Sequence, residues 1–205
     1  MKPPTATVFV VDDDDAVRSS LRLLLKSVGL PVSLYASAQE FLAGYDATHP
    51  GCLVLDIRMP GMGGLELQQH LSLRGATIPV VFITGHGDVE MAVEAMQHGA
   101  FDFLQKPFRD QDLIDRVQRA FEKDAATRRE LGEVSRIQAR IDSLTPRERE
   151  VLALVTSGKA NKVVAAELAV SPRTVEIHRA RVMEKMEAHS LAQLVRMVME
   201  VERHR

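Results

Sequence analysis

Side chains that could handle a phosphoryl group follow four apolar segments in the first half of the chain. Asp12 and Asp13 come after one segment, Asp56 after a second, Thr84 after a third and Lys106 after a fourth. Carboxylates without histidine or thiolate neighbours suit Mg²⁺, which also takes water and phosphate oxygens. A lysine opposite them would neutralise an incoming phosphoryl group, and a threonine hydroxyl would donate a hydrogen bond to it. The set indicates a magnesium site that receives a phosphoryl group.

The apolar segments in front of these residues are typical of strands in a parallel sheet. Continuous β-branched runs such as residues 8–11 indicate strands that are buried on both faces. Helical patterns separate the runs, and the short loops favour an α/β doubly wound sheet of five parallel strands. Such a sheet binds its ligands at the carboxyl ends of the strands. The expected strands are 8–11, 32–34, 52–55, 79–83 and 101–104, and the expected helices are 16–28, 38–43, 65–73, 89–97 and a segment from 110.

Each of these residues alone also has an ordinary structural explanation. A carboxylate after a strand commonly caps a helix or forms a turn, and we expect this role for Asp14 and Asp15. Thr84 alone would indicate a turn, and Lys106 alone a solvated side chain. The four strand ends together favour a shared site. Three histidines carry no metal-ligand spacing and are expected at the surface: His49, His70 and His98.

Four motifs coincide with these strand ends. They are Val-Val-Asp-Asp-Asp (10–14), Leu-Asp-Ile-Arg-Met-Pro-Gly (55–61), Ile-Thr-Gly-His-Gly-Asp (83–88) and Lys-Pro-Phe (106–108). Through them, residues 5–122 resemble a CheY-type receiver domain. The resemblance implies that Asp56 is the phosphoacceptor. It also implies that Asp13, Asp56 and the carbonyl of Arg58 bind Mg²⁺, with Asp12 supporting the metal through water.

The same resemblance assigns roles at the other strand ends. Thr84 and Lys106 would contact the phosphoryl oxygens, and the peptide bond between Lys106 and Pro107 would be cis. Thr84 and Phe103 would form the switch, with Phe103 turning inward as Thr84 moves toward the phosphate. An ordinary core role is the alternative for Phe103. His86 is expected either to tune the lifetime of the phosphate or to be a loop histidine without a task.

An enzyme with an aspartyl-phosphate intermediate is the rival interpretation of Asp56. Phosphatases of the haloacid dehalogenase type need a second acid two residues after the nucleophile. Arg58 stands at that position, which argues against this class. We therefore expect no enzyme, but a receiver that assists only its own phosphorylation and dephosphorylation.

The second half of the chain differs in charge and in pattern. Residues 1–124 hold 11 Lys and Arg against 17 Asp and Glu, whereas residues 125–205 hold 15 against 11. This asymmetry suggests that the second half meets a polyanion. Its patterns are helical, and Thr-Pro-Arg-Glu (145–148) is typical of a capped helix start. We predict a receiver domain at 1–122, a helical linker at 123–142 that is either solvated or self-pairing, and an all-α four-helix domain at 143–205.

A helix-turn-helix is expected in the segment that begins at residue 161. Small residues at Ala165 and Ala166 allow close packing of its first helix, and Ser171 with Pro172 opens the second. A helical module that binds a protein partner is the alternative. Residues 144–152, 161–162 and 171–179 resemble the LuxR/NarL-type helix-turn-helix domain. Taken whole, the chain resembles the FixJ family of two-component response regulators, with StyR- and TtrR-like regulators as relatives.

By this resemblance, residues 172–186 form the recognition helix in the major groove of DNA. Side chains near helix N-termini would contact phosphates, and Glu176, Ile177 and Arg179 would reach base edges. The final helix would pair two DNA-bound domains through Leu191, Leu194, Val195 and Val198. The expected DNA-contacting residues are Lys162, Arg173, Thr174, Glu176, Ile177 and Arg179.

The sequence departs from these families at two positions. Gln105 stands where such receivers often have an acid. Glu176 stands where other LuxR-type domains often have a lysine. The base preferences of those domains should therefore not be transferred to this chain.

Composition indicates a soluble protein of the cytoplasm. Apolar residues make up 45% of the chain and charged residues 26%, as in ordinary globular proteins. Cys52 is a lone cysteine, no apolar run reaches the ~18 residues of a membrane helix, and the N-terminus does not have the pattern of a signal peptide. The implied partners are a sensor histidine kinase, double-stranded promoter DNA and, on phosphorylation, a second copy of the chain in a homodimer. RNA polymerase is a further candidate, and no membrane is expected.

Overall fold

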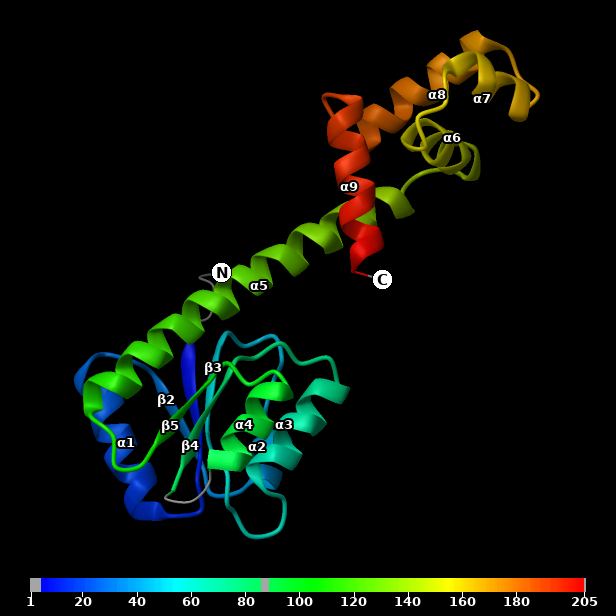
Figure 1. Ribbon diagram of the computed structural model, residues 1–205. Coiled ribbons are helices and arrows are strands. Elements are labelled where there is room, and N and C mark those ends of the chain that lie inside the picture. Colours follow the sequence, from blue (N-terminus) through cyan, green and yellow to red (C-terminus); the bar gives the residue numbers. More distant parts are fainter. Residues whose placement is uncertain (1–4, 86–88, 205) are drawn as a thin grey trace. The chain divides into compact units, whose positions relative to one another are not determined.

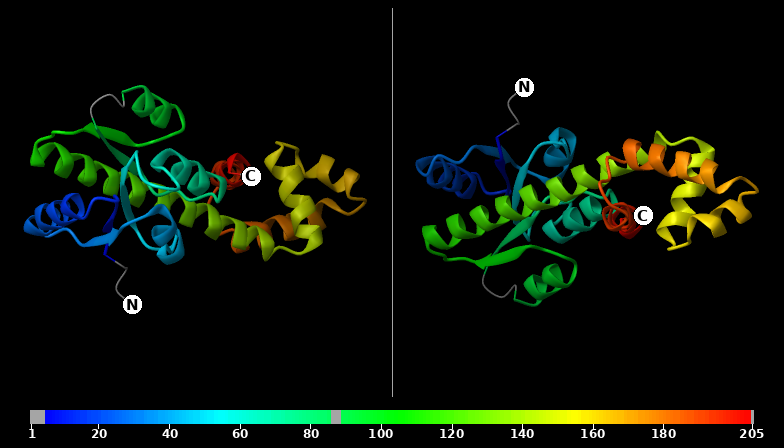
Figure 2. Two further views of the ribbon diagram at one scale, coloured as in Figure 1. Left: turned by 90° about the horizontal axis from the view of Figure 1, so that it is seen from below. Right: turned by 90° about the horizontal axis from the view of Figure 1, so that it is seen from above.

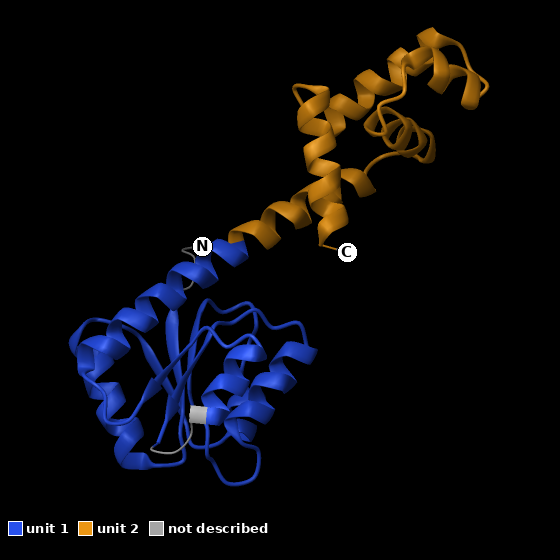
Figure 3. Cartoon of the chain, in the orientation of Figure 1, with its two compact units in different colours: residues 1–128 blue, residues 129–205 orange. Residues whose placement is uncertain are grey.

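The computed structural model describes residues 5–85 and 89–204. The chain divides into two compact units, residues 1–128 and residues 129–205 (Figure 3). Each unit has its own hydrophobic core. Within the described residues, no helix is both long and apolar enough to cross a bilayer.

The first unit is built on a sheet of five parallel strands (Figure 1). The strands are β1 (Thr7–Val11), β2 (Val32–Tyr35), β3 (Gly51–Asp56), β4 (Val80–Thr84) and β5 (Asp102–Gln105). Their order in space is β2-β1-β3-β4-β5, and every neighbouring pair is parallel. The carboxyl ends of the strands therefore share one edge, and the expected α/β doubly wound sheet is confirmed.

Helices cover both faces of this sheet (Figure 2). They are α1 (Asp15–Ser27), α2 (Ala38–Gly44), α3 (Gly64–Leu73), α4 (Val89–Gln97) and the beginning of α5 (Asp110–Asp142). One core packs α2, α3 and α4 around Phe41 and Phe82, and the other packs α1 and α5 around Leu25 and Val54. Because both faces are buried, the three central strands β1, β3 and β4 are apolar over most of their length, whereas the edge strands β2 and β5 also carry polar residues.

β3 lies in the middle of the sheet and ends at Asp56. Its residues from Gly51 to Leu55 are all buried, including Cys52, the only cysteine of the chain. Burial raises the pKa of the Cys52 thiol, and the nearby carboxylate of Asp124 raises it further. The thiol therefore remains protonated at neutral pH, and the strand presents only Asp56 to the solvent at its carboxyl end.

The helix starts follow from short polar side chains. The carboxylate of Asp14 accepts hydrogen bonds from the amides of Ala16 and Val17, which confirms its expected capping role, and Asp15 lies in the first turn. Ser37 caps α2 through the amide of Glu40. These caps satisfy amides that have no partner within the helix, so the chain turns sharply from strand edge to helix.

α5 continues without interruption from Asp110 to Asp142 and includes the whole of the expected linker at 123–142. Its residues belong to both units: Asp124 and Arg128 are hydrogen-bonded within the first unit, whereas Ile137 lies in the core of the second. The two compact units divide after Arg128, and the expected boundaries at 1–122, 123–142 and 143–205 stay predictions.

The second unit contains, in the described part of the chain, four helices besides the end of α5. They are α6 (Pro146–Thr156), α7 (Asn161–Glu167), α8 (Pro172–Lys185) and α9 (Leu191–Arg203). The hydroxyl of Thr145 accepts from the amide of Glu148, whose carboxylate accepts from the amide of Thr145, so the predicted helix start is confirmed. Ala169 adopts a φ of 52° in the turn between α7 and α8. The expected four-helix domain is thus present.

Candidate functional site

Two carboxylates and one ammonium group meet at the carboxyl edge of the sheet. Lys106 Nζ lies 2.9 Å from Asp56 Oδ1 and 3.2 Å from Asp12 Oδ2. β1 and β3 are neighbours in the sheet, so the residues that end them lie side by side, and the loop after β5 carries Lys106 to both. The fold thus brings together three residues that are far apart in the sequence.

Partial burial shapes the electrostatics of this cluster. Asp12 is 2% exposed, and burial raises the pKa of its carboxyl more than the amide of Asp14 and the charge of Lys106 lower it. Burial alone would lower the pKa of Lys106, but the hydrogen bond and charge of Asp56, together with Asp12, raise it. Lys106 is therefore protonated at neutral pH and is shared by two carboxylates.

The backbone around Asp56 fixes its side chain. Asp56 Oδ2 accepts from the amide of Arg58 at 2.8 Å. The chain then folds back, and the amide of Gly64 donates to the carbonyl of Ile57 at 2.9 Å. A β-carbon at residue 64 would lie 2.3 Å from the carbonyl oxygen of Asp56, so only glycine allows α3 to start this close to β3.

Thr84 and Phe103 lie on the neighbouring strands β4 and β5. Thr84 is 2% exposed, and its carbonyl accepts from the amide of Lys106 at 2.7 Å. The Lys106–Pro107 peptide is cis, as the resemblance implied. Phe103 stands opposite Phe82 in the β4–β5 register and packs half-buried against the core. This position is compatible with both expected roles of Phe103, the switch and the ordinary core aromatic.

The oxygen donors at this edge fit a magnesium ion. Asp12 and Asp56 point their carboxylates at one cationic group, Asp13 is exposed next to Asp12, and Arg58 offers a backbone carbonyl. Among the described residues, no group of three His, Cys, Asp or Glu side chains converges as a metal cage. Magnesium needs no such cage, since it combines one or two carboxylates with waters and phosphate oxygens.

The histidines of the first unit lie outside this cluster where the structure describes them. His98 is exposed, as expected, and its ring contacts the carbonyl of Glu94. His49 and His70 are half-buried and not fully exposed, and the ring of His49 lies 3.3 Å from Thr7 Oγ1. His86, for which a role in phosphate lifetime was considered, lies outside the described residues.

In the second unit, one face of α8 is exposed and carries mixed chemistry. Arg173, Glu176, Ile177 and Ala180 line a shallow depression of about 580 Å³. Spacings of three and four residues place them on one side of the helix, and Ile177 is 49% exposed. Sequence reasoning did not select Ala180, because alanine carries no chemical signal. Its helical spacing from Glu176 and Ile177 was the signal that could have identified it.

The other expected DNA-contacting residues do not line this depression. Arg179 is half-buried, and its Nη1 donates to Asn161 Oδ1 on α7 at 3.0 Å. The amide of Thr174 donates to Ser171 Oγ at 3.0 Å, so Thr174 belongs to the cap of α8. Lys162 is exposed in the first turn of α7. The structure therefore gathers Arg173, Glu176 and Ile177, and it leaves Lys162, Thr174 and Arg179 outside that group.

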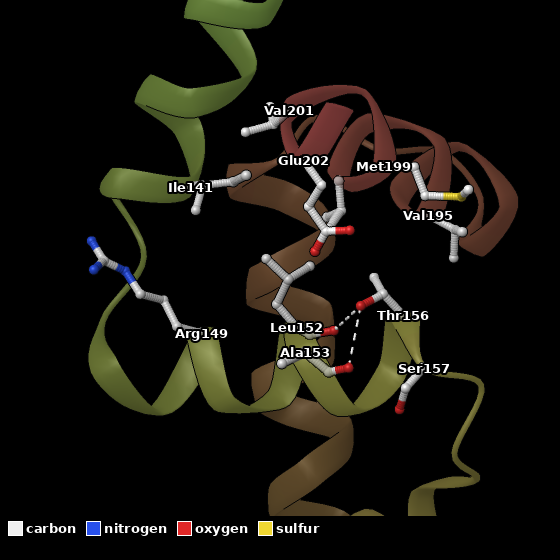
Figure 4. A pocket seen from close by; sticks show the side chains of 11 residues that line it. Ile141, Arg149, Leu152, Ala153, Thr156, Ser157, Val195, Met199, Val201 and Glu202 are labelled. Carbon is white, nitrogen blue, oxygen red and sulfur yellow. Dashed lines mark hydrogen bonds between the residues drawn. The ribbon is translucent and has the colours of Figure 1, made fainter. Parts of the chain in front are cut away.

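A groove of about 440 Å³ lies among the end of α5, α6 and α9 (Figure 4). Ile141, Leu152, Val195 and Met199 contribute apolar side chains to its lining, and Glu202 contributes a carboxylate. The groove lies beside α9 and has several apolar side chains in its lining. It is large enough to receive a side chain from another molecule.

The exposure of α9 corrects one expectation about this helix. Leu194, expected to pair two domains, is fully buried in the core of its own unit and cannot contact a second copy. Met199 is 58% exposed, and Leu191 is 37% exposed. The apolar pattern alone could not separate the inward from the outward side of the helix, because apolar residues occur on both.

Comparisons with known families cover both units. Residues 8–118 match the response regulator receiver domain, and residues 142–198 match the LuxR family of bacterial regulatory proteins. The transcriptional regulatory protein FixJ of Azorhizobium caulinodans is 49% identical over 197 residues, which is 96% of this chain and 93% of the relative. The chain belongs to the FixJ family of response regulators.

Other relatives of this FixJ-family regulator are similar over the same length. The response regulator protein TmoT of Ectopseudomonas mendocina is 41% identical over 196 residues, 96% of this chain and 89% of the relative. The structure of the response regulator StyR superposes with a TM-score of 0.85 at 44% identity and covers 96% of this chain and 99% of that one. Full-length FixJ from B. japonicum gives a TM-score of 0.59 at 42% identity and covers 98% of both chains. The regulator thus combines a receiver with a LuxR-type DNA-binding domain, in a family of transcriptional regulators and not of enzymes.

Proposed function

We propose that this FixJ-family regulator binds promoter DNA in response to phosphorylation of Asp56 by a sensor histidine kinase. The observation that carries the proposal is the shared ion pair of Lys106 with Asp56 and Asp12 at the strand edge. A phosphoryl group on Asp56 would offer Lys106 a new anionic partner, so the modification changes a contact that the protein already makes. The phosphotransferring domains of sensor histidine kinases and the promoters of bacteria lie in the cytoplasm, and the proposal places the protein there.

The proposed transfer moves a phosphoryl group from a kinase histidine to Asp56. The P–N bond of the phosphohistidine breaks, and a bond forms between phosphorus and a carboxylate oxygen of Asp56. Lys106 attracts the transferred oxygens, and the Thr84 hydroxyl donates to one of them. Asp12, Asp13, Asp56 and the carbonyl of Arg58 would hold Mg²⁺, which supplies charge neutralisation when bound. The same groups would assist hydrolysis of the aspartyl phosphate, the receiver's only reaction apart from phosphorylation.

A groove beside Lys106 supports the kinase as partner. It has a volume of about 420 Å³ and lies between α1 and the start of α5. Val17, Leu24, Pro107 and Phe108 line it with apolar side chains, and Lys106 is also among its lining residues. A kinase helix placed there would reach the phosphoacceptor without crossing the rest of the receiver.

Two surfaces support the proposed homodimer. α4 exposes Val93 by 50% and Met96 by 40%, and this helix lies next to β5 of the proposed switch. In the second unit, the groove beside α9 and the exposed Met199 could receive a second copy. Phosphorylation would favour pairing through the receiver, and α9 would pair the DNA-binding units on a two-fold DNA site.

The proposed DNA contact uses the exposed face of α8. Arg173 supplies a cation near the helix start, while Glu176, Ile177 and Ala180 offer one carboxylate and two apolar contacts for base edges. Lys162 remains a candidate for a phosphate contact from α7. RNA polymerase is the further candidate partner through which DNA binding would change transcription.

A fluorescence-anisotropy titration tests this function. Wild type and Asp56→Asn are titrated with promoter-sized duplex, with and without Mg²⁺ and beryllofluoride. We expect beryllofluoride with Mg²⁺ to tighten binding in wild type by about fivefold or more, and to leave Asp56→Asn unchanged. Equal binding under every condition would mean that phosphorylation is not the switch. Binding that is insensitive to salt would favour a protein partner, because phosphate contacts release counterions.

A further inference from the structure

A buried ion pair holds α5 against the end of the sheet opposite to Asp56. Asp124 has a side chain that is 2% exposed, and Arg128 one turn later contacts both of its oxygens at 2.8 and 3.0 Å. Asp124 Oδ2 also accepts from the amide of Gly51 at 2.9 Å. The guanidinium of Arg128 donates to the carbonyls of Thr48 and His49 at 3.1 and 2.7 Å. We call Asp124 and Arg128 the α5 clamp.

The clamp is attached to a rigid part of the receiver. Gly51 is the first residue of β3, the strand that ends at Asp56, and it stands opposite Thr7 of β1. A β-carbon at residue 51 would lie 2.1 Å from the carbonyl oxygen of Thr7, so the backbones are packed as closely as they can be. The helix is therefore fixed to the centre of the sheet and not to a surface loop alone.

Beyond the clamp, α5 contacts the second unit. Residues 129–131 and 133 are exposed, and Gly132 is half-buried. The carboxylate of Glu130 lies 3.3 Å from His204 Nε2, and Val134 packs beside Ile137 of the core of the second unit. Without the clamp, residues 122–128 would lose their ties to Gly51 and to the loop before it. A short charged helical segment is marginally stable in water without tertiary contacts.

We propose that the α5 clamp makes the first part of α5 a fixed arm of the receiver, so that pairing of two phosphorylated receivers confines two DNA-binding units to a small volume. This inference rests on the proposed function. The effective concentration of a tethered module falls as its tether lengthens or softens. Opening the clamp should therefore weaken cooperative binding to two half-sites and leave binding to one half-site unchanged.

The test uses the full chain and a DNA half-site that wild type enriches from random duplex. Asp124→Asn and Arg128→Met each open the clamp from one side, and either variant suffices if the other fails to fold. Glu133→Gln and Arg136→Met are matched controls. They make the same kinds of change in an exposed ion pair of the same helix. Circular dichroism confirms that each variant is folded.

Three measurements are made on each variant. Hydrogen exchange without phosphodonor should rise in residues 48–52 and 122–130 of the clamp variants and stay unchanged there in the controls. Sedimentation should show that beryllofluoride produces the same fraction of dimer in wild type, in the clamp variants and in the controls. Anisotropy with Mg²⁺ and beryllofluoride should show a roughly tenfold loss of affinity for duplex with two half-sites, and no loss for duplex with one.

The outcomes separate this inference from the proposed function. If the clamp variants bind the double site as tightly as wild type, or if their hydrogen exchange does not change, the fixed arm is wrong. If both duplexes lose affinity equally, the clamp acts on folding and not on coupling, which also overturns the inference. If wild type gains no affinity from beryllofluoride, the proposed function fails, and the coupling fails with it.

Discussion

Lys106 holds two carboxylates that would repel each other at the strand edge. The receiver therefore places the ammonium group of Lys106 beside Asp56 before any phosphoryl group is transferred. The sequence motifs predicted which residues meet, because each follows an apolar strand of a parallel sheet. They could not predict that Asp12 and Asp56 share one ammonium group at hydrogen-bonding distance. That depends on the loop geometry after β5 and on the close start of α3 at Gly64.

Glu148 is a buried carboxylate that joins two helices of the second unit. Its side chain is 3% exposed, and Lys185 Nζ of α8 lies 2.7 Å from its carboxylate. The hydrogen bond of Lys185, followed by that of the Thr145 amide, lowers the pKa of Glu148 to about 2. One carboxylate thus caps α6 and ties α8 to it.

Glu148→Gln should destabilise the second unit by about 1–3 kcal/mol at neutral pH, because the ammonium group of Lys185 loses a charged partner. A depressed pKa contributes stability above the unfolded value of 4.5, and the contribution is lost as pH falls toward about 2. The difference in the free energy of unfolding between wild type and variant, measured with urea, should therefore shrink as the pH falls through this range. Glu150→Gln, in an exposed pair with Arg147, is the control and should change little. A difference in unfolding free energy that does not depend on pH would contradict a stabilising charge on Glu148.

At the scale of elements, α8 divides its side chains between two tasks. Its exposed face carries Arg173, Glu176 and Ile177, whereas Arg179 is turned toward Asn161 of α7. The sequence treated these polar and apolar positions as one set of DNA contacts, because a motif match gives no helix phase. The hydrogen bond to Asn161 favours a role for Arg179 in orienting the two helices, and its expected contact with DNA stays a prediction.

Substitutions on α8 should separate these two tasks. Ile177→Ala should lower affinity for the enriched half-site and change the preference at one base position by about 1–3 kcal/mol, with little effect on thermal stability. Arg179→Met should lower affinity and thermal stability together, with the ranking of bases unchanged. Both are measured by anisotropy on single-base variants of the half-site and by thermal unfolding. A changed base preference in Arg179→Met would mean that Arg179 reads DNA directly.

The strands and most helices could be predicted from the sequence. Burial on both faces gives the central strands β1, β3 and β4 a continuous apolar run, and caps such as Asp14 and Thr145 mark the helix starts. The role of α5 could not be predicted. Asp124 and Arg128 stand in a charged stretch, where a buried acid has the same appearance as a solvated one. Only the tertiary contacts with Gly51 and the loop before it distinguish the two.

At the scale of the molecule, the boundary between the units has a measurable consequence. A fragment of residues 1–128 keeps the α5 clamp, whereas a fragment of residues 1–122 loses it. The longer fragment should be more stable by about 1–3 kcal/mol, because the charged hydrogen bonds at Gly51, Thr48 and His49 depend on the missing residues. Urea unfolding of both fragments tests this. Coincident transitions would show that the clamp adds nothing to the receiver.

Because Cys52 is buried, this chain can be labelled with a dye at a chosen position. As the only cysteine of the sequence, it lies fully buried in β3 with a raised thiol pKa, so maleimide dyes should not react with it while the receiver is folded. A cysteine introduced at exposed Leu131 would then take a dye alone, without removing the native residue. Energy transfer between two labelled copies could follow pairing in real time. Delayed labelling of Cys52 itself would time the opening of the sheet.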